Sequence, residues 1–455
     1  MEVMDADIDN GSYDYALNYP GTTNDGYEEF SLRSNQAHSQ KIGGKTSSVG
    51  AIFIVTNAAL GGAMLNIPNA VAHAGGVPVA LSIEIIFGIF AFAGLFFVGY
   101  CAEFNRSTIY QEVMRNMGGK TLEIITEVII ILYMFSICVS FIIFASDQEV
   151  KLLQLLLSES TFNEHYHLYK YATTIVLAVC VILPLCIPKN ISFLQYPSII
   201  CAVSCIYVAV LVIIKSFFPE DGIEVDSKPR SITTMLNIVP PIALGFQCHV
   251  SAVPVYAALK HRNMKHWLFV SFFSILSCFG IYSSIGICGY LAFGTNVNED
   301  VLDAFGVSSI PAIIGRIFVV ILISMSYPIL HFVGRASIES ISRKILKLSE
   351  QEGRSSWNRR LYFQTIIWFC LSIVIALVIP NYNAIVKPIG ALAALFEFGL
   401  PGFAIIRASE IVKSKISQAT YFLMNISGAI LIALSAFLFG ETFTSGVYTI
   451  ISVIS

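Results

Sequence analysis

The sequence predicts an all-α membrane protein with eleven transmembrane helices. Apolar residues (Ala, Val, Ile, Leu, Met, Phe, Trp, Tyr and Cys) make up 55% of the 455-residue chain, and only 13% of its residues are charged. A soluble protein carries about 25% charged residues, so this chain has too few to cover a water-facing surface of its size. The composition argues against a soluble enzyme, a nucleic-acid-binding protein and a disordered scaffold.

Eleven apolar runs support this count, because a helix needs about 20 mostly apolar residues to cross a bilayer. They cover residues 48–73, 76–101, 122–146, 170–187, 196–217, 232–258, 267–293, 310–333, 361–379, 384–406 and 419–440. Each run is expected to be helical, since hydrocarbon cannot satisfy an irregular backbone. Residues 1–46 hold eight acids and three bases among many polar residues, which predicts a disordered cytoplasmic tail before a transmembrane domain over 47–455.

The loops set the predicted orientation, because cytoplasmic loops are enriched in lysine and arginine. With the N-terminus in the cytoplasm, 20 of the 27 Lys and Arg residues lie in cytoplasmic segments. The other seven are Lys151, Lys170, Lys215, Lys228, Arg230, Arg316 and Lys387. We therefore expect a cytoplasmic N-terminus and a C-terminus in a lumen or the extracellular space.

Two of the runs contain residues that interrupt helices. The first includes TNAALGGAMLNIP (56–68), in which Gly61 and Gly62 lie at mid-span. The sixth includes VPPIALGFQCHVSAVP (239–254), in which Gly245 lies between prolines. Glycine permits non-helical backbone, and proline removes a helical hydrogen bond. Both runs repeat Ala-Leu-Gly, and each is the first span of a five-span half, so the two interruptions correspond.

Corresponding interruptions predict a transport site, because freed backbone groups at membrane depth must face a cavity or a ligand. An amino acid zwitterion suits such groups. N–H groups near Gly61 and Gly62 can bind its carboxylate, and carbonyls around Gly245 can bind its ammonium. The predicted substrate site comprises Leu60, Gly61, Gly62, Ala63, Gly245, Phe246, Gln247 and His249. The alternative is that Gly and Pro are simply frequent in membrane helices, which the pairing of the interruptions disfavours.

The residues around the interruptions resemble a known family. TNAALGGAMLNIP is similar to the first-helix motif of the sodium-coupled neutral amino acid transporters, solute carrier family 38, in the amino acid/auxin permease group. GFQCHVSAVPVY (245–256) resembles the GFQCH segment of the branch that holds members 7 and 8. SYPILHFVGR (326–335) resembles the eighth helix of the family, and the resemblance extends over about 45–440.

The resemblance implies a LeuT-like fold, with two inverted five-helix repeats, broken helices 1 and 6, and an eleventh helix. It also implies transport of glutamine, asparagine and related neutral amino acids. One departure concerns location. Plasma-membrane members typically carry a disulfide in a large extracellular loop, whereas no non-cytoplasmic loop here contains a cysteine. The ten cysteines are read as small buried apolar residues, because none has a zinc-ligand spacing.

The resemblance further implies a sodium site between helices 1 and 8. Asn57 matches the sodium-linked asparagine of the family, and Ser326 matches the hydroxyl position two residues before the proline of helix 8. Ser324 is a third candidate ligand. For Ser324 the sequence favours the alternative, an interhelical hydrogen bond, which is the usual task of serine in membranes.

Four other polar residues within the runs have a functional and a structural interpretation. His249 either binds substrate, responds to protons, or packs as a satisfied histidine. Acids inside a membrane are functional hypotheses by default, and here they are Glu84, Glu127 and Glu397. Glu397 precedes Gly399 and Pro401, which predicts a bend nearby. The structural alternative for all three acids is a buried carboxyl bonded to a neighbouring helix.

These observations predict a secondary active transporter for glutamine-like neutral amino acids, with sodium as the coupling ion and no other cofactor. Two alternatives stay open, a proton-coupled transporter and a membrane sensor that transports little. An intramembrane enzyme is disfavoured because the chain has no HExxH or GxGD motif. The pattern YEEF (27–30) fits a tyrosine-based sorting signal, which favours a lysosomal or endosomal membrane over the plasma membrane.

Overall fold

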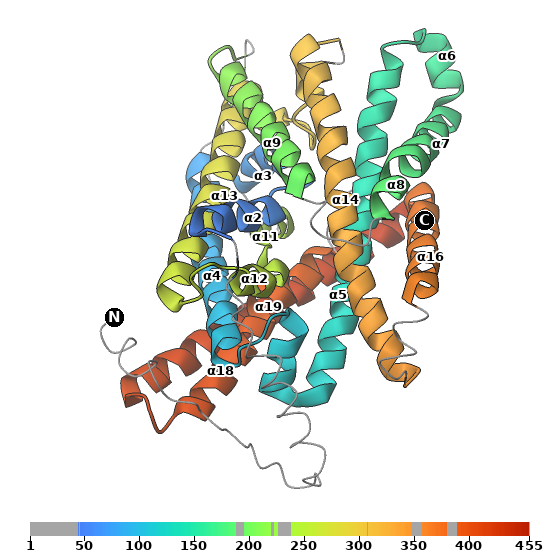
Figure 1. Ribbon diagram of the computed structural model, residues 1–455. Helices are drawn as coiled ribbons and strands as arrows, with labels where there is room; N and C mark the ends of the chain where they lie inside the picture. Colours follow the sequence, from blue (N-terminus) through green and yellow to red (C-terminus); the bar gives the residue numbers. More distant parts are fainter. Residues whose placement is uncertain are drawn as a thin grey trace. The chain divides into compact units, whose positions relative to one another are not determined.

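Helices account for most of the structure, a computed structural model that describes residues 44, 46–187, 195–219, 223–225, 238–306, 308–347, 357–379 and 389–454 (Figure 1). The predicted N-terminal tail up to Gly43 and the predicted sorting pattern lie outside these residues. The starts of the sixth and tenth apolar runs also lie outside them.

The helices of the first half are α2 (Ser48–Ala59), η2 (Gly62–Leu65), α3 (Ile67–Ala74), α4 (Val77–Phe104), α5 (Tyr110–Gln154), α6 (Glu159–Glu164), α7 (Tyr166–Leu177), η3 (Ala178–Ile182), α8 (Leu183–Cys186) and α9 (Gln195–Ser216). Those that follow are α11 (Val239–Phe246), α12 (His249–Ala257), α13 (Met264–Phe293), η5 (Gly294–Asn296), η6 (Asp303–Phe305), α14 (Ile310–Ile345), α16 (Trp357–Val378), η7 (Leu395–Gly399), α18 (Leu400–Val412) and α19 (Gln418–Ile454). Two of them, η3 and η7, are π-helical, and the other η elements are 3-10 turns.

Eight helices in the described part of the chain are long and apolar enough to cross a membrane. They correspond to eight of the eleven predicted runs. The remaining three runs contain shorter helical pieces. The run 48–73 is divided between α2 and α3, the run 232–258 between α11 and α12, and the run 196–217 contains the apolar segment Ile200–Ser216.

The helices pack in two main groups. In the first, α2, α3 and α4 pack on α13, and α12 packs on α4 and α2. In the second, α14 packs on α5, α9 and α16, and α5 also packs on α7. Figure 1 shows α14 beside α5 and α13 beside α4. The two groups meet where α13 packs on α9, while α18 packs on α19, α4 and α5.

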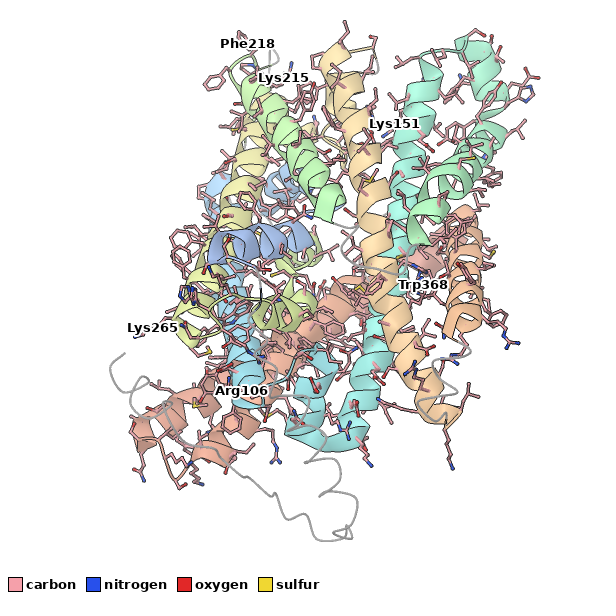
Figure 2. The ribbon with its side chains drawn as sticks, in the orientation of Figure 1. Arg106, Lys151, Lys215, Phe218, Lys265 and Trp368 are labelled. Atoms are coloured by element: carbon pink, nitrogen blue, oxygen red, sulfur yellow. The ribbon has the colours of Figure 1, made fainter. Side chains whose placement is uncertain are left out.

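Basic side chains lie at both ends of the helices. Figure 2 shows Lys151 and Lys215 toward one end and Arg106 and Lys265 toward the other. This division matches the two sets of basic residues that the sequence assigns to opposite sides of the membrane. All ten cysteines are free, and seven of them are buried. Among the described residues, no three His, Cys, Asp or Glu side chains gather as a metal site would require.

The contact between α4 and α13 leads to a first prediction. Trp267 of α13 is fully buried, and its indole N–H donates to the Leu95 carbonyl at 3.3 Å. A Cβ on Gly99 would lie 1.9 Å from the indole nitrogen. We expect Gly99→Ala to destabilise the protein by about 1–3 kcal/mol, because overpacking displaces the ring. Thermal unfolding in detergent measures the effect.

Gly280→Ala is the matched control. Gly280 lies on α13, the helix that carries Trp267, and a Cβ there meets nothing within 4 Å. The control variant should unfold at or slightly above the wild-type temperature, because alanine is the better helix former. Equal unfolding temperatures for the two variants would contradict the predicted contact.

Candidate functional site

The first apolar run loses its α-helical backbone after Ala59. The last hydrogen bond of α2 runs from the Leu60 N–H to the Thr56 carbonyl at 2.9 Å, and Leu60 itself is extended (φ −70°, ψ 122°). A 3-10 turn, η2, follows before α3 begins at Ile67. A helix end leaves carbonyls without intrahelical partners, and here the Ala59 carbonyl accepts the Tyr282 hydroxyl of α13 at 2.9 Å.

The sixth run is interrupted at Gln247 and Cys248, between α11 and α12. Both residues leave helical geometry, with φ −75°, ψ 100° at Gln247 and φ −130°, ψ 3° at Cys248. The Gln247 N–H donates to the Leu244 carbonyl at 3.3 Å, and the Cys248 carbonyl accepts the Ser251 N–H at 3.1 Å. The backbone therefore changes direction within two residues.

Gly245 does not lie at this interruption, which corrects the sequence-based placement by two residues. It belongs to α11, where a Cβ would lie 3.1 Å from the Tyr282 ring. The absence of a side chain therefore lets α13 pack closely on α11. Gly61, by contrast, lies outside a helix, since α2 ends at Ala59.

Tyr282 connects the two interruptions, and the sequence-based prediction of the site did not include it. Its hydroxyl bonds to the end of α2, and its ring packs against Gly245 and, edge to face, against Phe246 at 6.3 Å between centroids. A tyrosine within an apolar run carries no distinguishing signal in one sequence. Only the packing of α13 against both interrupted helices shows its position.

Four buried polar atoms without hydrogen-bond partners in the described structure lie next to the interruptions. They are Thr56 Oγ1, Asn57 Oδ1, Gln247 Nε2 and His249 Nδ1. Most buried polar groups in proteins are paired, so a cluster of unpaired groups requires an explanation. A polar ligand held between the two interruptions would supply partners to these atoms.

The other residues predicted to bind substrate lie in η2 or just before it, or in α11 and α12. Leu60 is buried, and Gly62 and Ala63 lie in η2. A Cβ on Gly61 would meet the Phe141 ring of α5 at 3.9 Å, an ordinary van der Waals distance, so a methyl group fits beside this glycine. Phe246 is buried in packing, and His249 Nε2 bonds to the Ala91 carbonyl at 3.0 Å.

The three candidate sodium ligands are not joined by any hydrogen bond among the described residues. Ser324 Oγ donates to the Val320 carbonyl of its own helix at 2.7 Å, and Ser326 Oγ lies 3.4 Å from Cys201 Sγ of α9. Asn57 alone has a buried, unpartnered oxygen. Of the three candidates, Asn57 thus has the one side-chain oxygen that is buried without a hydrogen-bond partner among the described residues, and both serines have other contacts.

The loop between α13 and α14 bonds to the second piece of the interrupted first run. Asn69 Nδ2 of α3 donates to the Val297 carbonyl at 2.8 Å, and Asn66 Nδ2 donates to the Glu299 carbonyl at 3.2 Å. The Val301 N–H donates to the Leu65 carbonyl at 3.1 Å. Three hydrogen bonds therefore fix this loop to η2 and α3.

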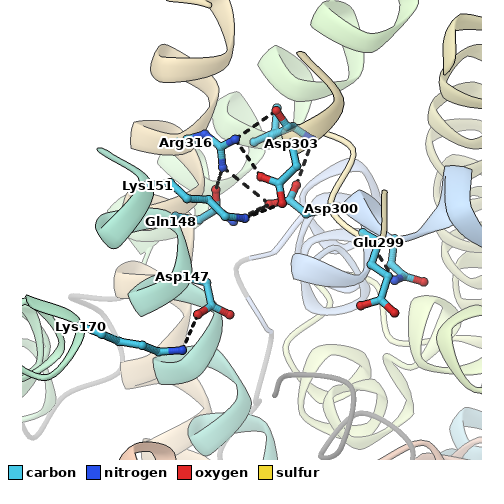
Figure 3. Close-up of polar contacts among 10 residues, drawn as sticks. Asp147, Gln148, Lys151, Lys170, Glu299, Asp300, Asp303 and Arg316 are labelled. Atoms are coloured by element: carbon cyan, nitrogen blue, oxygen red, sulfur yellow. Dashed lines mark hydrogen bonds and ion pairs between the residues drawn. The ribbon is translucent and has the colours of Figure 1, made fainter. Parts of the chain in front are cut away.

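The same loop is anchored on α5 and α14 by the Arg316 cluster, which comprises Gln148, Lys151, Asp300, Asp303 and Arg316 (Figure 3). Arg316 is only 1% exposed, and it donates to Asp303 at 2.8 Å and to Gln148 at 2.9 Å. Lys151 bonds to Asp303 at 2.6 Å. Burial raises the pKa of Asp300, although Lys151 and Arg316 oppose that rise. The cluster therefore links α3 to the α5–α14 group.

Comparison with known proteins identifies the class to which this fold belongs. Residues 44–445 match the family described as "Transmembrane amino acid transporter protein". The chain belongs to this family, so it is a multi-pass membrane protein of a transporter family and not an enzyme.

Within that class, the chain is similar to sodium-coupled neutral amino acid transporter 7. It is 36% identical to the Danio rerio protein over 410 residues, which cover 89% of this chain and 88% of the relative. It is 34% identical to the human protein of the same name over 409 residues, with coverage of 89% and 88%. Human solute carrier family 38 member 8 is 31% identical over 414 residues, with coverage of 88% and 94%.

The fold is also similar to that of a solved structure, MhsT in complex with L-phenylalanine. The alignment has a TM-score of 0.59 at 12% sequence identity and covers 88% of this chain and 99% of MhsT. At this identity the likeness concerns the fold alone. It agrees with the LeuT-like architecture that the family resemblance implies.

The Arg316 cluster leads to a second prediction. We expect Arg316→Met to destabilise the protein by about 1–3 kcal/mol, because it removes the buried donor of Asp303 and Gln148 and leaves Lys151 as the one cation of the cluster. Arg106→Met is the control, since the Arg106 side chain is 66% exposed in its pair with Glu103. An exposed pair contributes about 1 kcal/mol or less. Denaturation in detergent compares the two variants, and similar losses would show that the cluster does not stabilise the fold.

Proposed function

We propose that this protein is a secondary active transporter that moves neutral amino acids of the glutamine and asparagine type, coupled to sodium. The observation that carries the proposal is the pair of interrupted helices, with buried and unpartnered polar atoms beside both. The relatives named as sodium-coupled neutral amino acid transporters support the substrate class and the coupling ion. Sodium is cargo that crosses the membrane with the amino acid, and no other cofactor is proposed.

The helices are assigned to two inverted repeats of five, followed by one more helix. The first repeat is α2/α3, α4, α5, α7–α8 and α9. The second is α11/α12, α13, α14, α16 and the span Ile389–Val412, and α19 is the eleventh helix. In this assignment helices 1 and 6 are the broken ones. The two packing groups are the parts that move against each other during transport.

The substrate lies between the interruptions. Its carboxylate binds N–H groups of Gly61, Gly62 and Ala63, where the backbone has left α2. Its ammonium binds carbonyls at the C-terminal end of α11, where the helix dipole favours a positive charge. Gly245 contributes through its backbone, while Leu60 and Phe246 form apolar walls. Gln247 Nε2 and His249 Nδ1 are free to bond with a polar substrate side chain.

Sodium binds near Asn57, whose buried Oδ1 joins carbonyls freed at the end of α2. Ser326 supplies a hydroxyl when α14 approaches α2, and Ser324 is a secondary candidate because its hydroxyl already bonds within its own helix. A sodium ion that favours the substrate-binding arrangement of α2 raises the affinity for the amino acid. By linkage, the bound amino acid raises the affinity for sodium by the same factor.

The location proposed is a lysosomal or endosomal membrane, with residues 47–455 as the transporter domain and 1–46 as a cytoplasmic tail. The sorting pattern in the tail and the absence of cysteine from the predicted non-cytoplasmic loops support this location over the plasma membrane. The basic residues gathered at two opposite ends of the helices are consistent with a cytoplasmic N-terminus.

Uptake of radiolabelled glutamine into proteoliposomes tests the proposal, with sodium and pH varied separately. Uptake that stops when sodium is replaced at fixed pH supports sodium coupling. Uptake that follows only the pH gradient supports the proton-coupled alternative. Binding without uptake or exchange supports a sensor and contradicts transport.

A third prediction concerns the sodium ligand. We expect Asn57→Ala to raise the half-saturating sodium concentration for uptake about tenfold, which corresponds to about 1.4 kcal/mol. Ser324→Ala is the control and should change it little, because the Ser324 hydroxyl bonds to Val320 of its own helix. Unaltered sodium dependence of Asn57→Ala would remove this residue from the ion site.

A fourth prediction concerns the backbone that holds the substrate. Gly61→Val should abolish glutamine binding, because the side chain blocks close approach to the N–H groups. A Cβ at this position meets only Phe141 among the described atoms, at 3.9 Å, so Gly61→Ala should fold, and thermal unfolding shows whether Gly61→Val does. Equilibrium binding and thermal unfolding are measured together, with Gly61→Ala as a smaller step. Retained glutamine affinity in Gly61→Val would exclude Gly61 from the site.

A further inference from the structure

Three acids of the predicted spans differ in their hydrogen bonding. Glu84 accepts the Ser283 hydroxyl at 2.5 Å, and Glu127 accepts the Lys344 ammonium at 2.9 Å. Glu397 is fully buried, and neither of its carboxylate oxygens has a hydrogen-bond partner within the described part of the chain. An isolated carboxylate in such surroundings is strongly unfavourable, so Glu397 requires a neutralising partner.

Glu397 lies in η7, a π-helical turn of the kind often found at functional sites. A Cβ built on Gly94 of α4 would lie 2.2 Å from the Glu397 carbonyl and 3.2 Å from His249 Nε2. The backbone at Glu397 and the His249 ring therefore meet at one glycine. Tyr133 of α5 packs against Phe396, the neighbour of Glu397, with ring centroids 5.5 Å apart.

His249 offers an unused acceptor at this junction. Its Nε2 lies 3.0 Å from the Ala91 carbonyl, so Nε2 carries the hydrogen of this bond. In the neutral ring Nδ1 is then a lone-pair acceptor, and it is buried without a partner. His249 Nδ1 is therefore an acceptor without a hydrogen-bond partner, on a residue that packs with the Glu397 backbone around Gly94.

The groups that face η7 supply no permanent positive charge. From α5 come Tyr133 and Tyr110, and the Tyr110 hydroxyl bonds to the Phe396 carbonyl at 3.3 Å. From the α11–α12 junction come Cys248 and His249. From α19 comes Ser435, which bonds to the Ala394 carbonyl at 2.9 Å, and α4 presents Gly94 and the Ala91 carbonyl. No lysine or arginine bonds to Glu397 in the residues described, so a proton is the partner these contacts favour.

We propose that Glu397 is a proton-binding site at the junction of η7 with the interrupted helix α12. A proton adds to one carboxylate oxygen while the junction is closed, as in this structure, and leaves to water when α12 separates from η7. No other bond forms or breaks. Protons thus favour the closed junction, and acidic pH shifts the population toward it. The effect on transport rests on the function proposed above, whereas the proton site itself does not.

The proton site is tested without transport by infrared difference spectra between acidic and alkaline pH on the purified full-length protein. A protonated carboxylic acid has a C=O stretch that a carboxylate lacks. We expect a component of this band that disappears in Glu397→Gln and persists in Glu84→Gln. Glu84 is the matched control, because it is equally buried in a membrane helix but has a serine partner. A spectrum unchanged by Glu397→Gln overturns the proposal.

The functional consequence is the fifth prediction and is measured in proteoliposomes with a fixed sodium gradient. Wild-type protein and Glu84→Gln should show glutamine uptake that varies with pH, and Glu397→Gln should lose this variation while retaining exchange at equal pH. Glu397→Asp should restore it in part. Persistence of the wild-type pH profile in Glu397→Gln contradicts the proposal. If no variant transports any amino acid, the proposed function fails, and the infrared result still decides the proton site.

Discussion

The requirement that backbone polar groups find partners inside a membrane governs this structure. Continuous helices such as α4 and α13 meet it within themselves. After Ala59, and at Gln247 and Cys248, helical geometry ends, so the backbone groups there cannot all pair within a helix. Tyr282 supplies one substitute, a hydroxyl bonded to the Ala59 carbonyl. The remaining freed groups lie where we propose that a zwitterion binds, because a polar ligand there supplies partners that the helices do not.

The polar side chains divide in the same manner. Charged groups at the ends of α5 and α14 are paired, as Glu127 is with Lys344 and Arg316 with Asp303. The unpaired atoms of Asn57 and Gln247 lie beside the interruptions instead. Paired groups stabilise one arrangement of the helices, whereas unpaired groups are free to exchange ligands. In the function proposed above, the unpaired atoms beside the interruptions serve transport and the paired groups hold the fold.

The contacts between the helix groups suggest how binding is transmitted. The loop after α13 bonds to Asn66 and Asn69 on one side and, through Asp303, to α5 and α14 on the other. A change at the first interruption therefore reaches the second group of helices through a short polar connection. The junction of α12 with η7 is a second connection, where His249 and the Glu397 backbone pack around Gly94 beside the proposed proton site.

The sequence by itself determined the all-helical membrane class, the family and the regions of the two interruptions, because composition and glycine and proline placement act locally along the chain. Tertiary structure decided the rest. The second interruption lies at Gln247 and Cys248 and not at the predicted Gly245, which stays in α11 and packs closely against Tyr282. Tertiary structure also distinguishes Glu397 from Glu84. Both acids lie in apolar runs, but a neighbouring helix presents a hydrogen-bond donor, Ser283, only to Glu84 among the described residues. Partners distant in sequence, such as Ser283 and Tyr282, leave no local pattern in a single chain.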